Sequence, residues 1–416
     1  MKKKTSDRRS PRQDPPPAQV TVFQRLLQGL LTRTESAGAQ PVEPLAHLDY
    51  ERELSLKHEA LCNLWRQHKL GDLPEPVMPS PRPRHYRTTT RRRAHYSPGR
   101  LQLGFGDGRG SSVALPESHL EPEAHSAIYR FLVEALATPA NRALATHLNH
   151  AIIRGSYEAF SVILNLDFLD GSIVRRLKKL SEQLQALPQN ILSNFVFCDP
   201  SRSDYYFERE APPVAVRLKK MFGPARFPLR LAGHRYALPP TSFTQVNESM
   251  VEPMLGAVRT MLQPSPGDRL LDLYCGFGLF AHDLADTCME VVGIDVDRDA
   301  IAAATEHLRF ESPKGRVTFH RRDISAESLT ASLPEPGGRE LVVLDPPRRG
   351  VDPGVITCLA HRRPVRVVHI CCGVETIPAA VTAWKQDGYG VTRCLPLDMF
   401  AGTPNLEVLM LLEPIG

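Results

Sequence analysis

Short apolar runs alternate with helical stretches along the C-terminal part of the chain. The runs with strand character span residues 269–275, 290–295, 316–320, 341–345, 366–371, 389–394 and 406–412. Helical stretches separate the first five, as parallel strands joined by crossover helices require. Only a short loop separates the last two, so we expect that pair to be antiparallel. The pattern predicts an α/β fold whose C-terminal domain, residues 231–416, contains a seven-stranded Rossmann-like sheet.

The start of the chain has a different pattern. Residues 1–20 are rich in Lys, Arg and Pro and are expected to form a disordered basic tail. In residues 21–83, apolar residues recur at helical spacing over 22–31 and 45–70, which predicts helices packed against the rest of the protein. Residues 71–83 contain five prolines and are predicted to be a linker.

Residues 84–230 mix both kinds of pattern. The segments 100–105 and 158–166 have strand character, whereas 123–136 and 172–187 have helical spacing. We therefore predict a central α/β domain here. It contains no motif that indicates chemistry of its own.

Composition limits the class of protein. The chain has 416 residues, 42% of them hydrophobic, which is enough for a sizeable core. No apolar run approaches the roughly 18 residues that a membrane span needs, so no membrane association is expected. The basic start from Met1 has no apolar segment behind it, which argues against a secretory signal. A cytoplasmic location is the expectation.

Positive charge is concentrated near the start. Residues 1–100 carry 19 Lys or Arg and 10 Asp or Glu, and seven arginines occur between Arg82 and Arg100 without an acid. Such a block attracts phosphates whatever the nucleotide sequence. Tyr86 and Tyr96 are interleaved with it as surfaces on which bases can stack. A solvated linker and an RNA contact are both compatible with this segment.

The eight cysteines contain no Cys-x-x-Cys pair. That spacing is typical of zinc ribbons and iron–sulfur clusters, so we expect neither a metal nor a cluster. Most of the cysteines are expected to be reduced and buried. Cys372 needs another explanation, because it directly follows the apolar run that ends at Cys371.

A glycine-rich turn follows the first strand of the C-terminal domain, in Asp272-Leu-Tyr-Cys-Gly276-Phe-Gly278. Glycines let a ligand approach the backbone, and the helix start leaves amide groups free. With Ala281 the run fits the dinucleotide pattern G-x-G-x-x-A. Asp295 ends the next strand, where a carboxylate can accept ribose hydroxyls. These features fit either NAD or S-adenosylmethionine.

Asp345-Pro346-Pro347 at the end of the fourth strand is more discriminating. This turn presents a carboxylate and a backbone carbonyl to a flat heterocycle, for which a nicotinamide enzyme has no use. Enzymes that methylate exocyclic amines place an aromatic residue next, whereas Arg348 follows here. Asp323, past the third strand, either holds an adenine amino group or caps a turn.

Cys372 and Glu407 suit a covalent reaction at carbon 5 of uracil, which is a poor nucleophile. A thiolate that adds to carbon 6 makes carbon 5 nucleophilic, and a base must later remove the proton from carbon 5. Cys372 follows the fifth strand and Glu407 lies near the start of the last one. The alternative is an inert buried thiol and a surface acid. Cys371 is a second candidate thiol, but strand alternation points it to the other face.

These residues resemble the RNA uracil-5-methyltransferase family, whose members act on tRNA and on 23S ribosomal RNA. The resemblance covers residues 242–412, with the motifs S-F-x-Q-x-N, D-L-Y-C-G-x-G, D-P-P-R, a cysteine turn and D-x-F-…-E-V in the family's order. It implies a class I methyltransferase domain, S-adenosylmethionine as cofactor and structured RNA as substrate. Cys372 would be the nucleophile and Glu407 the base. The expected cofactor and base pocket comprises Gln245, Tyr274, Gly276, Gly278, Asp295, Asp323 and Asp345.

The chain departs from the family pattern at two positions. The cysteine turn is usually S-C-N-P, whereas Cys371 and Gly373-Val374 flank Cys372, and Leu279 stands where an asparagine is frequent. A catalytically impaired protein that binds S-adenosylmethionine and RNA is therefore the second interpretation. An NAD-dependent oxidoreductase is a third, and the Asp-Pro-Pro turn argues against it.

Overall fold

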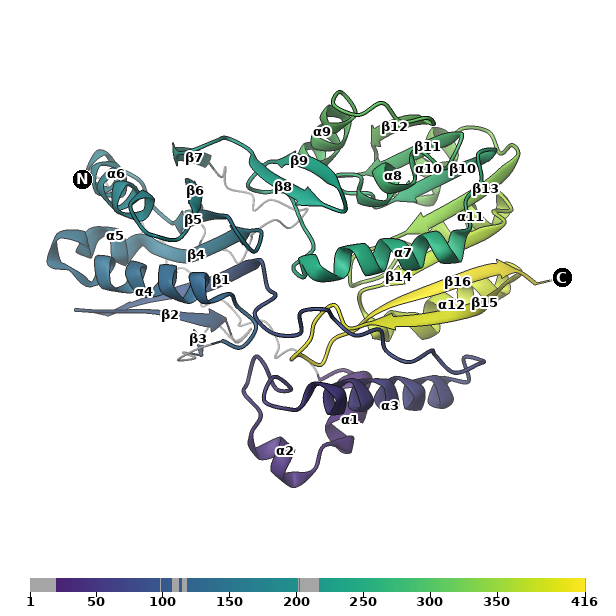
Figure 1. Cartoon of the computed structure of the whole chain (residues 1–416), viewed down its shortest axis with the longest axis horizontal. Coiled ribbons are helices and arrows are strands. Elements are labelled where there is room, and N and C mark those ends of the chain that lie inside the picture. Colours follow the sequence, from purple (N-terminus) through teal and green to yellow (C-terminus); the bar gives the residue numbers. More distant parts are fainter. Residues whose placement is uncertain are drawn as a thin grey trace, which may run out of the picture.

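The computed structural model describes residues 20–97, 99–106, 112–113, 118–200, 202 and 217–415. The predicted tail lies outside these residues, apart from Val20. Two seven-stranded sheets lie side by side, and the N-terminal helices pack below the C-terminal sheet (Figure 1). Among the helices of the described segments, none combines the length and apolar character needed to cross a bilayer.

The C-terminal sheet confirms the predicted architecture. Its strand order is β12-β11-β10-β13-β14-β16-β15, with β16 antiparallel to both β14 and β15 and the other pairs parallel. Helices connect the first five strands. The strands are β10 (Asp268–Leu273), β11 (Glu290–Asp295), β12 (Arg316–Arg321), β13 (Arg339–Leu344), β14 (Arg366–Cys371), β15 (Tyr389–Leu397) and β16 (Glu407–Pro414), and the connecting helices are α8 (Leu279–Leu284), α9 (Arg298–His307), α10 (Ala326–Ser332), α11 (Val355–His361) and α12 (Ile377–Gln386).

The strand order determines where the site forms. The parallel strands β10, β13 and β14 are neighbours, so the turns after them meet at one edge of the sheet. β16 runs the opposite way, and Val408 near its start pairs with Cys371 at the end of β14. The first residue of β16 therefore lies at the same edge as the residue that follows β14.

The central domain has a sheet in the order β3-β2-β1-β4-β5-β6-β7, with helices packed on it over an apolar core. The predicted strands and helices of this region are present. Its elements are β1 (Thr89–Ser97), β2 (Arg100–Gly106), β3 (Ser112–Val113), α4 (Glu123–Ala137), α5 (Arg142–His147), β4 (Leu148–Gly155), β5 (Phe160–Leu166), α6 (Gly171–Gln185), β6 (Ile191–Cys198) and β7 (Arg217–Phe222). A hairpin, β8 (Phe227–Leu231) and β9 (His234–Leu238), then leads to α7 (Val251–Leu262) and packs into the C-terminal core.

The N-terminal helices extend the layer that covers one face of the C-terminal sheet. They are α1 (Val22–Leu30), α2 (Arg33–Ala37) and α3 (Tyr50–His68). Phe23, Leu27 and Trp65 are buried in the same apolar cluster as Val374 and Leu406 of the C-terminal domain. Helices α1 and α3 thus contribute to the core of the C-terminal domain.

The proline-rich segment 71–83 is bonded along the edge of the sheet. Backbone N–H groups of Glu75 and Met78 donate to the carbonyls of Cys394 and Pro396, at 2.9 and 2.8 Å, and Asp398 N–H donates back to Met78 at 3.0 Å. These bonds cover the otherwise open edge of β15. The segment is therefore an ordered strap on β15 as well as a connection.

Two residues of the basic block serve the interior, so the interpretation of Tyr86 as a stacking surface is wrong and Arg92 is not available to phosphates. Tyr86 is fully buried and donates its hydroxyl to the Ala401 carbonyl at 3.0 Å. Arg92 is buried against Glu121 and over the Phe105 ring, at 3.6 Å from its centroid. The partners of these two side chains, Ala401 and Glu121, lie outside the segment, so the segment's own sequence does not indicate that they are buried.

Candidate active site

Strand register brings the proposed nucleophile and base together. The Sγ atom of Cys372 lies 3.5 Å from Glu407 Oε1, 3.6 Å from Asp345 Oδ1 and 3.7 Å from the Pro346 carbonyl oxygen. Glu407 opens β16, Cys372 follows β14, and Asp345 follows β13. Three of the residues predicted for the site therefore converge, within 4.8 Å of one another.

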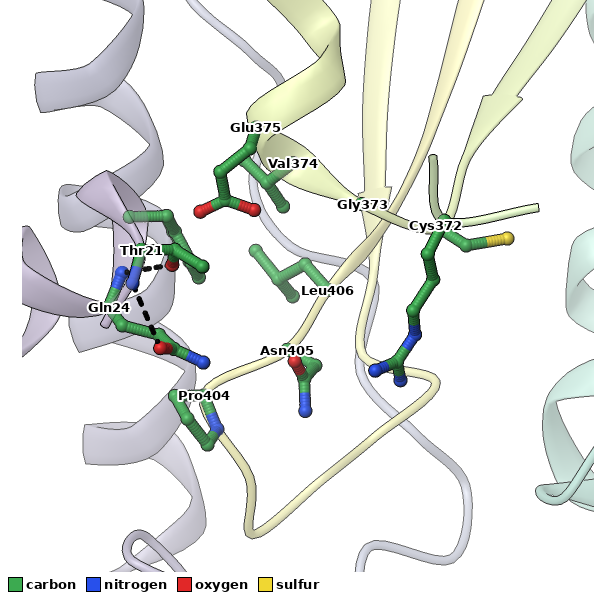
Figure 2. A pocket seen from close by; sticks show the side chains of 11 residues that line it. Thr21, Gln24, Cys372, Gly373, Val374, Glu375, Pro404, Asn405 and Leu406 are labelled. Carbon is green, nitrogen blue, oxygen red and sulfur yellow. Dashed lines mark hydrogen bonds between the residues drawn. The ribbon is translucent and has the colours of Figure 1, made fainter. Parts of the chain in front are cut away.

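A pocket of about 270 Å³ adjoins the cysteine turn. Figure 2 shows the Cys372 thiol pointing away from Thr21 and Gln24, at the N-terminal end of α1, and thus away from that side of the pocket. The thiol faces the two carboxylates instead. The pocket is lined by Thr21, Phe23, Gln24, Arg348, Cys372, Gly373, Val374, Glu375, Pro404, Asn405 and Leu406.

Burial controls the protonation of this cluster. It raises the pKa of Glu407 to about 7. Burial, together with the charge of Glu407, also raises the pKa of Asp345 well above its ordinary value. The Cys372 pKa lies well above its usual range because the thiol is buried between the two carboxylates. Near neutral pH the cluster therefore retains protons, and Glu407 is poised between its two states.

Cys371 has a different environment from its neighbour. It is buried in the apolar core, and burial raises the pKa of its thiol to about 12. Its side chain is on the opposite face of β14 from the carboxylates, as strand alternation predicts. Cys372 is thus the thiol that faces the other polar groups of the site.

The glycine turn after β10 has the backbone expected of a cofactor loop. Gly278 has φ = 84°, and a Cβ there would lie 2.8 Å from the Phe319 ring. Gly276 also has positive φ, but a Cβ there would meet nothing within 4 Å, so the space above it is open. Tyr274 precedes it with φ = 64° and is buried. The turn leaves an open cradle beside the backbone.

Two aspartates hold this turn in place. Asp295 accepts N–H bonds from Gly276 at 2.9 Å and from Asp297 at 2.8 Å, one on each carboxylate oxygen. A carboxylate oxygen can accept more than one hydrogen bond, so these bonds do not prevent Asp295 from accepting ligand hydroxyls as well. Asp272 Oδ2 accepts from Ala281 N at 3.0 Å, while its Oδ1 is buried without a hydrogen-bond partner. Burial raises the pKa of Asp272 to about 7.

Two predicted residues are not drawn into these contacts. Gln245 lies in the loop before α7, where its backbone carbonyl accepts a bond from Thr88 Oγ1 at 3.5 Å. Asp323 is exposed two residues after β12. Within the described parts of the chain, neither side chain forms a hydrogen bond or ion pair. Their roles remain predictions from the resemblance.

Three contributors to the site were not among the predicted site residues. Asp272 was quoted in the motif without a role, although an acid in an apolar strand is a signal of function. Arg348 lines the pocket, and its charge lowers the pKa of Glu407 against the effect of burial. The contribution of α1, through Phe23 and Gln24, had no signal in the sequence.

Comparison with known proteins agrees with this geometry. Residues 218–415 match the family model described as tRNA (Uracil-5-)-methyltransferase. An uncharacterized RNA methyltransferase of Enterococcus faecalis is 26% identical over 403 residues, which cover 94% of this chain and 86% of that protein. The 23S rRNA (uracil(1939)-C(5))-methyltransferase RlmD of Salmonella choleraesuis is 34% identical over 184 residues, which cover 44% of this chain and 41% of that enzyme.

A solved structure shares the fold of nearly the whole chain. It is the tRNA (uracil-54, C5)-methyltransferase of Pyrococcus abyssi in complex with S-adenosyl-L-homocysteine, with a TM-score of 0.65 and 21% identity. The match covers 89% of this chain and 85% of that one. The matched family segment contains every site residue that the sequence predicts. The C-terminal segment, residues 218–415, therefore belongs to the RNA uracil-5-methyltransferase family.

Proposed function

We propose that this protein methylates carbon 5 of a uridine in structured tRNA or ribosomal RNA, through a transient bond between Cys372 and carbon 6. The observation that carries the proposal is the 3.5 Å distance between Cys372 Sγ and Glu407 Oε1. This distance supports a role for Cys372 as nucleophile and for Glu407 as base, because a proton can pass between the two groups. The family membership supplies the reaction class.

Cys372 begins the reaction by giving up its proton to the adjoining carboxylates, of which Glu407 is the one with a pKa of about 7. The thiolate then adds to carbon 6 of the uracil, and the electrons of the C5–C6 double bond move to the carbonyl oxygen on carbon 4. When bound, S-adenosylmethionine supplies the methyl group that carbon 5 receives.

Glu407 completes the cycle by removing the proton from carbon 5. The electrons of that C–H bond re-form the C5–C6 double bond, and the bond from carbon 6 to sulfur breaks. Glu407 must therefore be ionised at this step, so any proton that it accepted from Cys372 has to leave it first. Asp345 keeps its proton near neutral pH because of its raised pKa. A neutral carboxyl there can donate a hydrogen bond to the carbonyl oxygen that gains charge.

The residues around the glycine turn fit S-adenosylmethionine. Gly276 leaves room for the ligand against the backbone, and the carboxylate of Asp295, at the end of the next strand, is a suitable acceptor for ribose hydroxyls. The unpartnered Oδ1 of Asp272 is a buried acceptor at the same turn, and a ligand donor would satisfy it. The target base must leave its stack to reach Cys372, with Gln245 and Asp345 as the expected contacts.

The test is covalent trapping on RNA that contains 5-fluorouridine, with S-adenosylmethionine present. Fluorine at carbon 5 cannot be removed as a proton, so a working enzyme stays bonded to the RNA. Mass spectrometry should find the adduct on Cys372. Cys372→Ala should abolish it, whereas Cys371→Ala, the neighbouring thiol, should retain it.

Sequencing the attached RNA then distinguishes tRNA from ribosomal RNA. An adduct that persists in Cys372→Ala would refute the assignment of the nucleophile. Absence of any adduct, in a protein that still binds S-adenosylmethionine and RNA, would instead support the catalytically impaired binder.

A further inference from the structure

A second group of metal-ligand side chains lies outside the proposed active site. His234 of β9, His307 at the end of α9, and Glu311 just after α9 have ligand atoms within 4.8 Å of one another. His234 Nδ1 is 2.6 Å from Glu311 Oε1, and His307 Nε2 is 2.9 Å from the same oxygen. Figure 1 shows β9 beside α9, at the end of the C-terminal sheet formed by β12.

Hydrogen bonding accounts for only part of this cluster. The contact between His234 and Glu311 has the geometry of a hydrogen bond. The contact between His307 and Glu311 does not, and both ring nitrogens of His307 are buried without a hydrogen-bond partner, although the residue is only 5% exposed. A buried polar group without a hydrogen-bond partner destabilises the fold. A ligand that accepts the lone pair of the imidazole would remove that destabilisation.

Aromatic side chains pack around the imidazole of His307. The His282 ring packs edge-on against it, with centroids 4.4 Å apart. Tyr236 stacks on the His307 ring, with centroids 4.5 Å apart, and fixes its orientation.

We propose that His234, His307 and Glu311 bind one zinc ion. Two imidazoles and a carboxylate are a known zinc ligand set, with bonds of about 2.0–2.2 Å. Tetrahedral bonds of that length separate ligand atoms by about 3.3 Å, so the two distances to Glu311 need to open by about 0.7 and about 0.4 Å. His234 and Glu311 are only half-buried, which gives the ion a route from solvent and leaves the fourth position to water.

The site would join separate elements behind the cofactor turn. It links the β8–β9 hairpin to α9, and His282 of α8 connects it to Gly278, where a Cβ would lie 2.9 Å from the imidazole carbon. The expected role is to hold this wall in place. The proposal departs from the expectation of no metal, which rested on the absence of Cys-x-x-Cys pairs. His307 and Glu311 lie 73 and 77 residues after His234, and the ligand set includes no cysteine, so no short spacing in the sequence indicates it.

The test measures zinc in the untagged full-length chain after treatment with a chelator and addition of zinc chloride. We expect about one zinc ion per chain after gel filtration and a higher melting temperature with zinc than without. Glu311→Gln and His234→Gln, both at half-exposed positions, should each weaken zinc binding at least tenfold. His147→Gln is the matched control, because His147 forms an ordinary pair with Asp167 at 2.7 Å.

A second control separates this site from the catalytic cluster, which also contains metal-ligand side chains. Cys372→Ala should bind zinc as the unaltered chain does. If Cys372→Ala loses the zinc and Glu311→Gln keeps it, the ion belongs to the active site and the proposal fails. It fails equally if the chelated chain takes up no zinc and its melting temperature does not change. Circular dichroism of each zinc-free variant checks the fold.

Discussion

Cys372 combines high potential reactivity with a resting state that suppresses it. If its thiolate formed between ionised Asp345 and Glu407, three negative charges would lie within 4.8 Å. The raised pKa values of all three groups show that the folded chain avoids this by retaining protons. In the proposed mechanism the nucleophile therefore forms when a proton moves within the cluster, and Glu407 is the nearest acceptor, at 3.5 Å.

The buried carboxyl of Glu407 should make stability depend on pH. Its pKa rises from 4.5 to about 7 in the folded chain, so the folded state holds a proton that the unfolded chain releases. The stabilisation is complete below the unfolded pKa and is lost as the pH rises through 7. Glu407→Gln has no proton to lose, so it should be more stable than the unaltered chain by about 3 kcal/mol at pH 8 and about 1 kcal/mol at pH 5.

Denaturant unfolding at a series of pH values measures this difference. Glu375→Gln is the matched control, because Glu375 lines the same pocket but is exposed. Its stability difference should stay within about 0.5 kcal/mol at every pH. An advantage of Glu407→Gln that did not grow with pH would mean that Glu407 is already ionised in the resting fold.

At the scale of elements, the loop 398–406 between β15 and β16 positions the proposed base, since it leads directly into Glu407. An N-terminal helix holds it: Lys57 of α3 donates to Asp398 at 2.6 Å and to Glu53 at 2.7 Å, with all three side chains fully buried. Tyr50 at the start of α3 donates to Asp398 at 2.9 Å. A buried ionic network therefore attaches the catalytic loop to α3.

Lys57→Met should disrupt this attachment. The methionine fills the space but leaves Glu53 and Asp398 buried without their common cation, which costs about 3–5 kcal/mol. Loss of the constraint on the loop should also slow methyl transfer. Thermal or denaturant unfolding measures the first effect, and single-turnover kinetics at a temperature where the variant stays folded measures the second.

Arg52→Met is the matched control on the same helix. Arg52 pairs with Glu35 at 2.8 Å, but its side chain is 39% exposed, and such pairs contribute about 0–1 kcal/mol. A variant Lys57→Met that was as stable as Arg52→Met would show that the network does not anchor the loop.

The strands of the C-terminal sheet were predictable because parallel strands covered on both faces are continuous apolar runs. β11 and β14 begin and end where the sequence indicates. The strap 71–83 was not predictable in the same way. Its prolines indicate a break in regular structure, but its hydrogen-bond partners, Cys394 and Pro396, lie more than 300 residues away along the chain.

At the scale of the whole molecule, the same difference between local patterns and distant contacts explains which parts of the site could be predicted. Cys372, Asp345 and Glu407 each begin or follow a predicted strand, so strand order alone brings them together. The interior positions of Tyr86 and Arg92 depend on contacts with Ala401 and Glu121, which no local pattern indicates. Chemistry placed at strand ends is readable from sequence, whereas packing between distant segments is not.

Two deletions of different length should distinguish two roles of the N-terminal region, which are attraction of RNA by the basic tail and stabilisation of the core by α1. Residues 1–19 carry six Lys or Arg and two Asp, a charge that attracts RNA without regard to sequence. Deleting them should weaken RNA binding and make it less dependent on salt, with the melting temperature unchanged. Filter binding across a salt series measures the slope, which should fall by about 0.7 for each phosphate of single-stranded RNA that the shortened chain no longer neutralises.

Deleting residues 1–31 should have a different effect, because it also removes α1. Phe23 and Leu27 are each 1% exposed in the catalytic core, and burial of such a side chain contributes about 1.5–3 kcal/mol. This deletion should therefore destabilise the fold by about 3–6 kcal/mol and open the pocket beside the cysteine turn. Equal melting temperatures for the two deletions would contradict a structural role for α1. An unchanged salt slope after the shorter deletion would show that the basic residues of the tail do not contact RNA.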